Sequence, residues 1–195
     1  MTLELFLNRL QRILVLDDTV FDEIRDDIRF TAVSLGAAVG AVFLAALGAW
    51  LYGETVLDGT PDGWFVDTVV LGSFFTIILF GAGIAVTYLL LAQVFRVEGI
   101  PVDDFARVAL VTHAPYALGL LVFVPEIGFT FGILSVVGTV FYSMYGVGAA
   151  FRDASRTAAL FSVLAGSLVW MLLIPVISDP GNNYVTGVFV YSLIA

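Results

Sequence analysis

The sequence of 195 residues contains no cysteine, no lysine and a single histidine, His113. The lack of cysteine excludes disulfide bonds, thiolate metal sites and cysteine nucleophiles together. One histidine cannot build a histidine-rich metal centre, and the GxSxG and HExxH motifs of serine hydrolases and zinc peptidases are missing too. From the residues we therefore predict no enzyme, no cofactor and no metal site.

Basic residues are also few. Eight arginines stand against 17 acidic residues, which gives a formal net charge of −9 and a pI near 4.2. Nucleic acids and anionic surfaces require a basic patch, so this balance argues against a nucleic-acid partner. An acidic, lysine-free composition is similar to that of proteins from salt-loving archaea, and we expect an archaeal source.

Hydrophobic residues, by contrast, are abundant. They make up 60 % of the chain, against about 45–50 % in soluble domains, and the mean hydropathy is +1.02. A helix needs roughly 20 apolar residues to cross a bilayer, and five runs are long enough. These runs cover residues 30–52, 68–95, 105–124, 129–151 and 157–177. We predict an all-α integral membrane protein, a bundle of five transmembrane helices. The second run must tilt, project or bend near Gly81–Gly83, because it is longer than a perpendicular crossing needs.

Charge predicts the orientation of the bundle. The eight arginines lie before the first run, on either side of the loop between the second and third runs, where Arg107 starts the third run, and between the fourth and fifth. The other connections contain only acidic charges. Under the positive-inside rule, the N-terminus is cytoplasmic and the C-terminus extracytoplasmic. We predict a multi-pass protein of the cell membrane.

Two shorter segments flank the predicted membrane domain of residues 30–177. Residues 1–29 form a cytoplasmic amphipathic leader, with apolar residues at helical spacing from Leu3 to Leu14. It either lies on the membrane surface or packs on the base of the bundle. Residues 178–195 form a short apolar extracytoplasmic tail. In it, residues 184–195 fit an interfacial segment, and a partial sixth span is the alternative.

Small residues are expected to pack the helices closely. Gly36 and Gly40 stand in GxxxG register beside a strip of alanines, and Gly128 and Gly132 repeat the spacing. We expect these residues to pack this bundle, and a dimerisation motif is the less favoured interpretation.

The candidate intramembrane polar site comprises His113, Tyr116 and Arg107. His113 lies two helical turns into the third run, next to Pro115, which removes a backbone donor and loosens the helix. Two interpretations follow for His113. It is either a proton or ligand site in a bundle cavity, or a structural residue bonded to a freed carbonyl or a neighbouring serine, which we favour. Arg107 is expected to extend to the inner interface.

The third and fourth runs resemble the Yip1 domain family. The similar segments are FARVA at 105–109, THAPYAL at 112–118, VPEIG at 124–128, GVGAA at 146–150 and DASRTAA at 153–159. The resemblance implies five spans, a cytoplasmic N-terminus and a non-enzymatic membrane role. Eukaryotic members of the family bind prenylated Rab GTPases and carry a DLYGP-type motif. Since this chain lacks that motif, Rab binding is not carried over.

These features lead to a functional hypothesis. We expect a non-enzymatic, Yip1-like membrane protein that acts as a membrane-embedded interaction or organising element. Its expected partners are the lipid bilayer and other proteins or a second copy of the chain. The alternative is a small transporter or channel with a site near His113.

Overall fold

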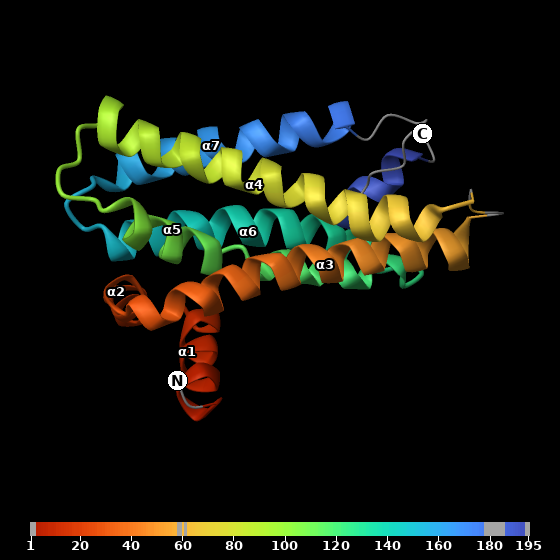
Figure 1. Cartoon of the computed structure of the whole chain (residues 1–195), viewed down its shortest axis with the longest axis horizontal. Coiled ribbons are helices and arrows are strands. Elements are labelled where there is room, and N and C mark those ends of the chain that lie inside the picture. The colour runs from red at the N-terminus through yellow and green to blue at the C-terminus, as the bar shows by residue number, and fades with distance from the viewer. Residues whose placement is uncertain (1–2, 58–59, 61, 178–185, 194–195) are drawn as a thin grey trace.

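A computed structural model describes residues 3–57, 60, 62–177 and 186–193. Long helices lie side by side along one axis, and a short helix near the N-terminus projects across it (Figure 1). The helical elements are α1 (Leu3–Leu14), α2 (Asp18–Asp26), η1 (Ile28–Phe30), α3 (Thr31–Val56), η2 (Val66–Leu71), α4 (Gly72–Leu89), η3 (Leu90–Val94), α5 (Val102–Val111), η4 (Ala114–Phe123), α6 (Gly128–Ala150), α7 (Arg156–Ile177) and η5 (Gly187–Leu193).

Five segments of the described chain are long and apolar enough to cross a membrane, as the sequence predicts. They are Ile28–Val56, Val66–Val94, Val102–Phe123, Gly128–Ala150 and Arg156–Ile174. For the second segment, of which the sequence predicts tilt, projection or a bend, the α-helix continues without a break through Gly81–Gly83. Its irregular turns are instead π-helical and lie at both ends, in η2 and η3.

The third segment changes its helix type halfway. The α-helix α5 ends at Val111, and the chain continues as the 3₁₀ helix η4, with Pro115 in its first turn. Because a 3₁₀ helix rises about 2.0 Å per residue, against about 1.5 Å in an α-helix, this change stretches the segment. Both α3 and α6 pack against η4, and α4 packs against α7.

The glycines that pack the bundle are not all those expected. A Cβ atom added at Gly36 or Gly40 would meet no heavy atom within 4 Å, so the prediction that this pair packs the bundle is wrong. The packed face of α3 instead contains Gly48, whose added Cβ would collide with the backbone of η4. Similarly, a Cβ on Gly83 of α4 would lie 2.6 Å from the carbonyl oxygen of Gly166 in α7.

The second GxxxG pair behaves as expected. An added Cβ on Gly128 would collide with the carbonyl of Val122, and one on Gly132 would lie 2.7 Å from the Cβ of Val188. Close packing through small residues therefore does hold this bundle together, but only part of the small-residue pattern takes part.

The N-terminal leader divides into two parts. Helix α2 packs on α5 and α6 with three fully buried apolar side chains, Val20, Phe21 and Ile24. Helix α1 projects away from the long helices and runs across their direction (Figure 1). Its junction is fixed by Arg9, which pairs with Asp27 at 2.9 Å and lies over the ring of Phe30. Helix α2 thus packs on the base of the bundle, whereas α1 extends sideways from that base.

The described part of the tail packs inside the bundle. Helix η5 contacts α3, α6 and η4, and the side chain of Val190 is fully buried. The described residues of the tail therefore pack against three helices instead of lying free of the bundle. Residues 184–185 and 194–195 lie outside the described residues, and the seven-residue η5 is too short for a sixth span.

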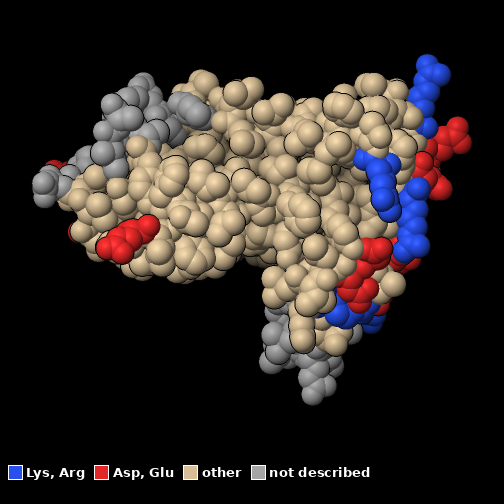
Figure 2. Space-filling model, turned by 180° about the vertical axis from the view of Figure 1, so that it is seen from behind, with Lys and Arg blue, Asp and Glu red and all other residues tan. Residues whose placement is uncertain are grey.

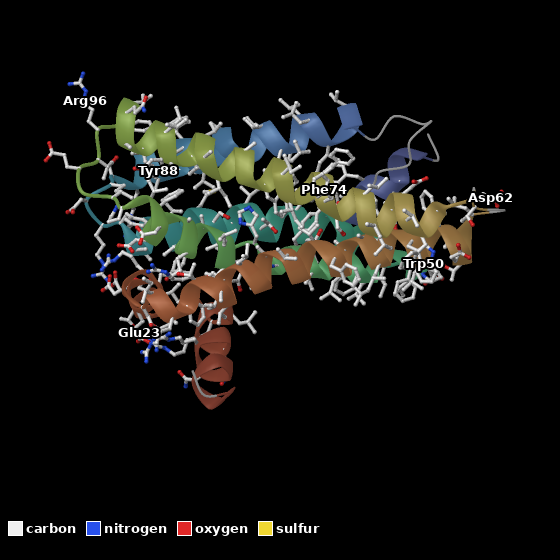
Figure 3. The ribbon with its side chains drawn as sticks, in the orientation of Figure 1. Glu23, Trp50, Asp62, Phe74, Tyr88 and Arg96 are labelled. Atoms are coloured by element: carbon white, nitrogen blue, oxygen red, sulfur yellow. The ribbon has the colours of Figure 1, made fainter. Side chains whose placement is uncertain are left out.

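Charged side chains gather at the two ends of the molecule. Seen from behind, all visible arginines lie at one end, a few acidic residues lie at the other, and a broad uncharged zone separates them (Figure 2). Arg96 points outward at the arginine end, and Asp62 marks the opposite end (Figure 3). The fold thus places the arginines at one end of the molecule, as the sequence predicts.

Candidate functional site

The three candidate residues occupy two separate places. The rings of His113 and Tyr116 both pack against Phe80, with centroids 4.6 and 5.0 Å from the Phe80 centroid. Arg107 lies further towards the arginine end and contacts the leader instead. The structure therefore divides the predicted site into an aromatic centre and a buried arginine.

His113 is held by the irregular backbone where α5 ends. Its own N–H bonds to the carbonyl of Leu110 rather than to that of Ala109, as a 3₁₀ turn requires. The carbonyl of Ala109, thereby freed, accepts a hydrogen bond from His113 Nδ1 at 2.7 Å. It also accepts one from Thr112 Oγ1 at 2.7 Å. Because a carbonyl only accepts, Nδ1 carries the proton in this contact. This is the bond to a freed carbonyl that the structural interpretation describes.

A small cavity lies beside His113. Its volume is about 20 Å³, and its polar lining includes Thr87, Ser143 and Ser167. A water molecule needs about 10–15 Å³ on the same measure, so the cavity has space for about one water. One water and an imidazole can exchange a proton locally, but a space of this size does not accommodate a solute.

Tyr116 connects the aromatic centre to the tail. Its hydroxyl lies 2.8 Å from Thr186 Oγ1, which is in turn 3.2 Å from Thr76 Oγ1. All three side chains are buried, so each hydroxyl finds its partner within the protein. Trp170 packs edge-on against both Phe80 and Tyr116. The site around Tyr116 therefore joins η4, α4 and the tail.

Arg107 is buried, with 2 % of its surface exposed, because the leader covers it. Its guanidinium group reaches the arginine end but is covered by the leader. It donates to the carbonyls of Ile24 and Arg25 and, through Nε, to Thr31 Oγ1 at 3.0 Å. Asp104 lies 3.3 Å away on the same helix and supplies a counter-charge. Arg107 thus ties α2 and the start of α3 to α5.

Several residues of this region were not anticipated from the sequence. Phe80 and Trp170 look like ordinary apolar span residues, and only the fold places them around His113 and Tyr116. Thr186 follows a turn signal and lies 70 residues from Tyr116, so no local pattern points to their hydrogen bond. For Arg107, the sequence indicates only two partners, Asp103 and Asp104, which stand four and three residues before it on the same helix.

The chemistry available in this region is limited. Within the described ranges, no group of three or more histidine, cysteine, aspartate or glutamate side chains could hold a metal ion. His113 has aromatic and hydroxyl neighbours, and its ring contacts neither a carboxylate nor a nucleophile among the bonds described above. The arrangement suits helix packing and a local proton or water contact. In comparisons with known proteins, no family model, no curated protein and no solved structure matches the chain.

Proposed function

We propose that the five apolar segments cross the cell membrane, with the arginine end and the N-terminus on the cytoplasmic side. The segment lengths and the uncharged zone between the two charged ends support the crossing (Figure 2). The location of every arginine at one end supports the orientation. In this arrangement α1 would lie along the cytoplasmic surface, since it runs across the direction of the long helices (Figure 1).

We further propose that the protein acts as a non-enzymatic, membrane-embedded interaction or organising element of Yip1-like type. The observation that carries this proposal is the packing around His113. Its ring bonds to its own helix, and the adjoining cavity holds about one water. A pathway for solutes would need a larger polar channel. The open faces of Gly36 and Gly40 leave part of α3 free for a second helix, from another copy or another protein.

Flux measurements on purified protein in liposomes test this proposal against the transporter alternative. We expect proton and small-ion flux equal to that of empty liposomes between about pH 5 and 8, where an ordinary histidine titrates. We also expect His113→Ala to leave that background unchanged. A pH-dependent flux that is present in the wild type and lost in His113→Ala would make the protein a transporter or channel.

Cysteine accessibility provides a second test that does not require a known solute. Because the chain has no cysteine, a single His113→Cys substitution can be probed without background. We expect a small water-soluble thiol reagent to leave this position unmodified, while an exposed control, Ser155→Cys, reacts. Rapid modification at position 113 would reveal an aqueous path into the bundle.

A further inference from the structure

A groove lies between α6 and α7. It lies at the arginine end of the bundle and has a volume of about 470 Å³. Ligand pockets typically have volumes of about 300–1,000 Å³. The groove takes no part in the contacts of His113, Tyr116 or Arg107 described above, so it is a separate feature.

The wall of the groove is apolar along the two helices. Phe141, Met144 and Gly148 line it from α6, and Leu160 lines it from α7. Phe141 is about half exposed, so the wall faces outward from the bundle. A wall of this kind matches a hydrocarbon chain, because each buried methylene contributes about 0.8 kcal/mol.

Two opposite charges, Arg156 and Asp18, lie at the polar part of the groove. Arg156 is exposed and forms no ion pair within the described residues, whereas six of the other arginines do. Asp18 comes from α2 and accepts a hydrogen bond from the Tyr145 hydroxyl, and it too lacks an arginine partner there. The groove therefore offers a free guanidinium and a carboxylate next to an apolar wall.

We propose that this groove binds one glycerophospholipid with an amine-bearing headgroup. The phosphate binds the guanidinium of Arg156, since guanidinium groups match phosphate oxygens in a bidentate fork. The headgroup ammonium lies near Asp18, and an acyl chain lies along Phe141, Met144 and Leu160. This inference rests on the proposed membrane insertion and is independent of the organising role.

Gly148 provides a way to fill the groove without disturbing the packing. An added Cβ there would meet only the Cβ of Ala159, at 4.0 Å, which is ordinary contact. A Gly148→Leu side chain would therefore extend into the space of the acyl chain. Gly81 is a matched control, because it is exposed and an added Cβ would meet nothing within 4 Å. Arg96, which also has no ion pair among the described residues, is the control for Arg156.

Lipid retention measured by native mass spectrometry tests the site. Detergent-purified protein is mixed with dioleoylphosphatidylethanolamine, and the bound lipid is counted. We expect one retained lipid in the wild type, in Arg96→Gln and in Gly81→Leu. Arg156→Gln and Gly148→Leu should each lower the apparent affinity about tenfold, as the loss of a charge-assisted contact or of an acyl contact implies. Equal retention in wild type, Arg156→Gln and Gly148→Leu would overturn the proposal.

Two further arms identify the ligand. Dioleoylglycerol, which lacks the phosphate, should bind at least tenfold more weakly, and soluble glycerophosphoethanolamine should not displace the lipid. Displacement by the soluble headgroup would overturn the proposal, because the apolar wall would then contribute nothing. A carbonate wash of membranes separates this failure from a failure of insertion. Wild-type protein released by the wash would refute membrane insertion, whereas protein that stays in the membrane yet binds lipid without Arg156 would refute the site alone.

Discussion

The two ends of this bundle are held together by different forces. At the arginine end, ion pairs and guanidinium bonds to backbone carbonyls, with Arg9, Arg12 and Arg107 at the centre, add to the apolar packing of α2. At the other end, the tail is fixed by apolar packing of Val190 and by neutral hydroxyl contacts to Tyr116. The packing of the leader is therefore expected to depend on charge and pH, whereas the packing of the tail is not. Three of the four experiments that follow therefore measure both ends at once.

The largest effect is expected from Arg107→Met. The substitution removes the donor to the buried carbonyls of Ile24 and Arg25 and leaves Asp104 without its partner. We expect the free energy of unfolding to fall by about 2–3 kcal/mol, since buried acceptors then lose their donor. Amide exchange should accelerate in residues 18–26 and stay unchanged in residues 187–193. Arg96→Met is the control, and equal acceleration at both ends would contradict the comparison.

A smaller effect is expected from Tyr116→Phe. It deletes one buried hydroxyl, so Thr186 keeps only its contact with Thr76. A single neutral hydrogen bond contributes about 1 kcal/mol, and we expect a loss of that size in unfolding experiments. Exchange should now accelerate in residues 187–193 and not in residues 18–26. Tyr88→Phe, which loses a 3.3 Å bond to Ile100 near the arginine end, should show no change in the tail.

Acidification should loosen the leader and spare the tail. Hydrogen bonding to Arg12 lowers the pKa of Asp17 to about 2, and Arg29 and Arg9 lower the pKa of Asp27. Because both pKa values are depressed in the folded protein, the stabilisation is present above about pH 4 and is lost as the pH falls towards about 2. Hydroxyl groups do not titrate in that range. Exchange followed from about pH 5 to 2, corrected for the intrinsic rate, should show extra opening only in the leader. Arg12→Gln should reduce this pH dependence. Amide exchange in the leader that does not change with pH in the wild type would contradict the prediction.

The smallest effect is expected from Arg152→Gln. Its ion pair with Asp22 is short, at 2.9 Å, but the arginine side chain is 65 % exposed. Exposed pairs contribute about 0–1 kcal/mol and are screened by salt. We expect a loss under about 0.5 kcal/mol that disappears in about 1 M salt, by the same unfolding assay. A loss as large as that of Arg107→Met would show that burial does not set the strength of these contacts.

Particular residues show where prediction from the sequence works in this protein. The five long segments were predicted within a few residues at most ends, because apolar length is a strong signal. The break near His113 was also anticipated, since Pro115 cannot donate a backbone hydrogen bond. The bond of His113 to the carbonyl of Ala109 has a different cause, because that carbonyl is freed by the 3₁₀ turn at His113 itself.

Other features were beyond the reach of local patterns. Nearly every face of these helices is apolar, so the sequence does not distinguish the packed Gly48 from the open Gly36 and Gly40. Arg107 looks like an interfacial residue until the leader folds over it. The tail looks like a surface segment because its partner Tyr116 is far away in the chain. Each of these errors concerns a contact between distant segments.

The central claim, five crossings with the arginine end inside the cell, is best tested by single-cysteine labelling in intact cells. The cysteine-free chain permits Asp62→Cys and Glu126→Cys at one end and Glu98→Cys and Ser155→Cys at the other. With a membrane-impermeant maleimide, we predict labelling of positions 62 and 126 in intact cells, and of positions 98 and 155 only after permeabilisation. Labelling of positions 126 and 155 from the same side would contradict the topology.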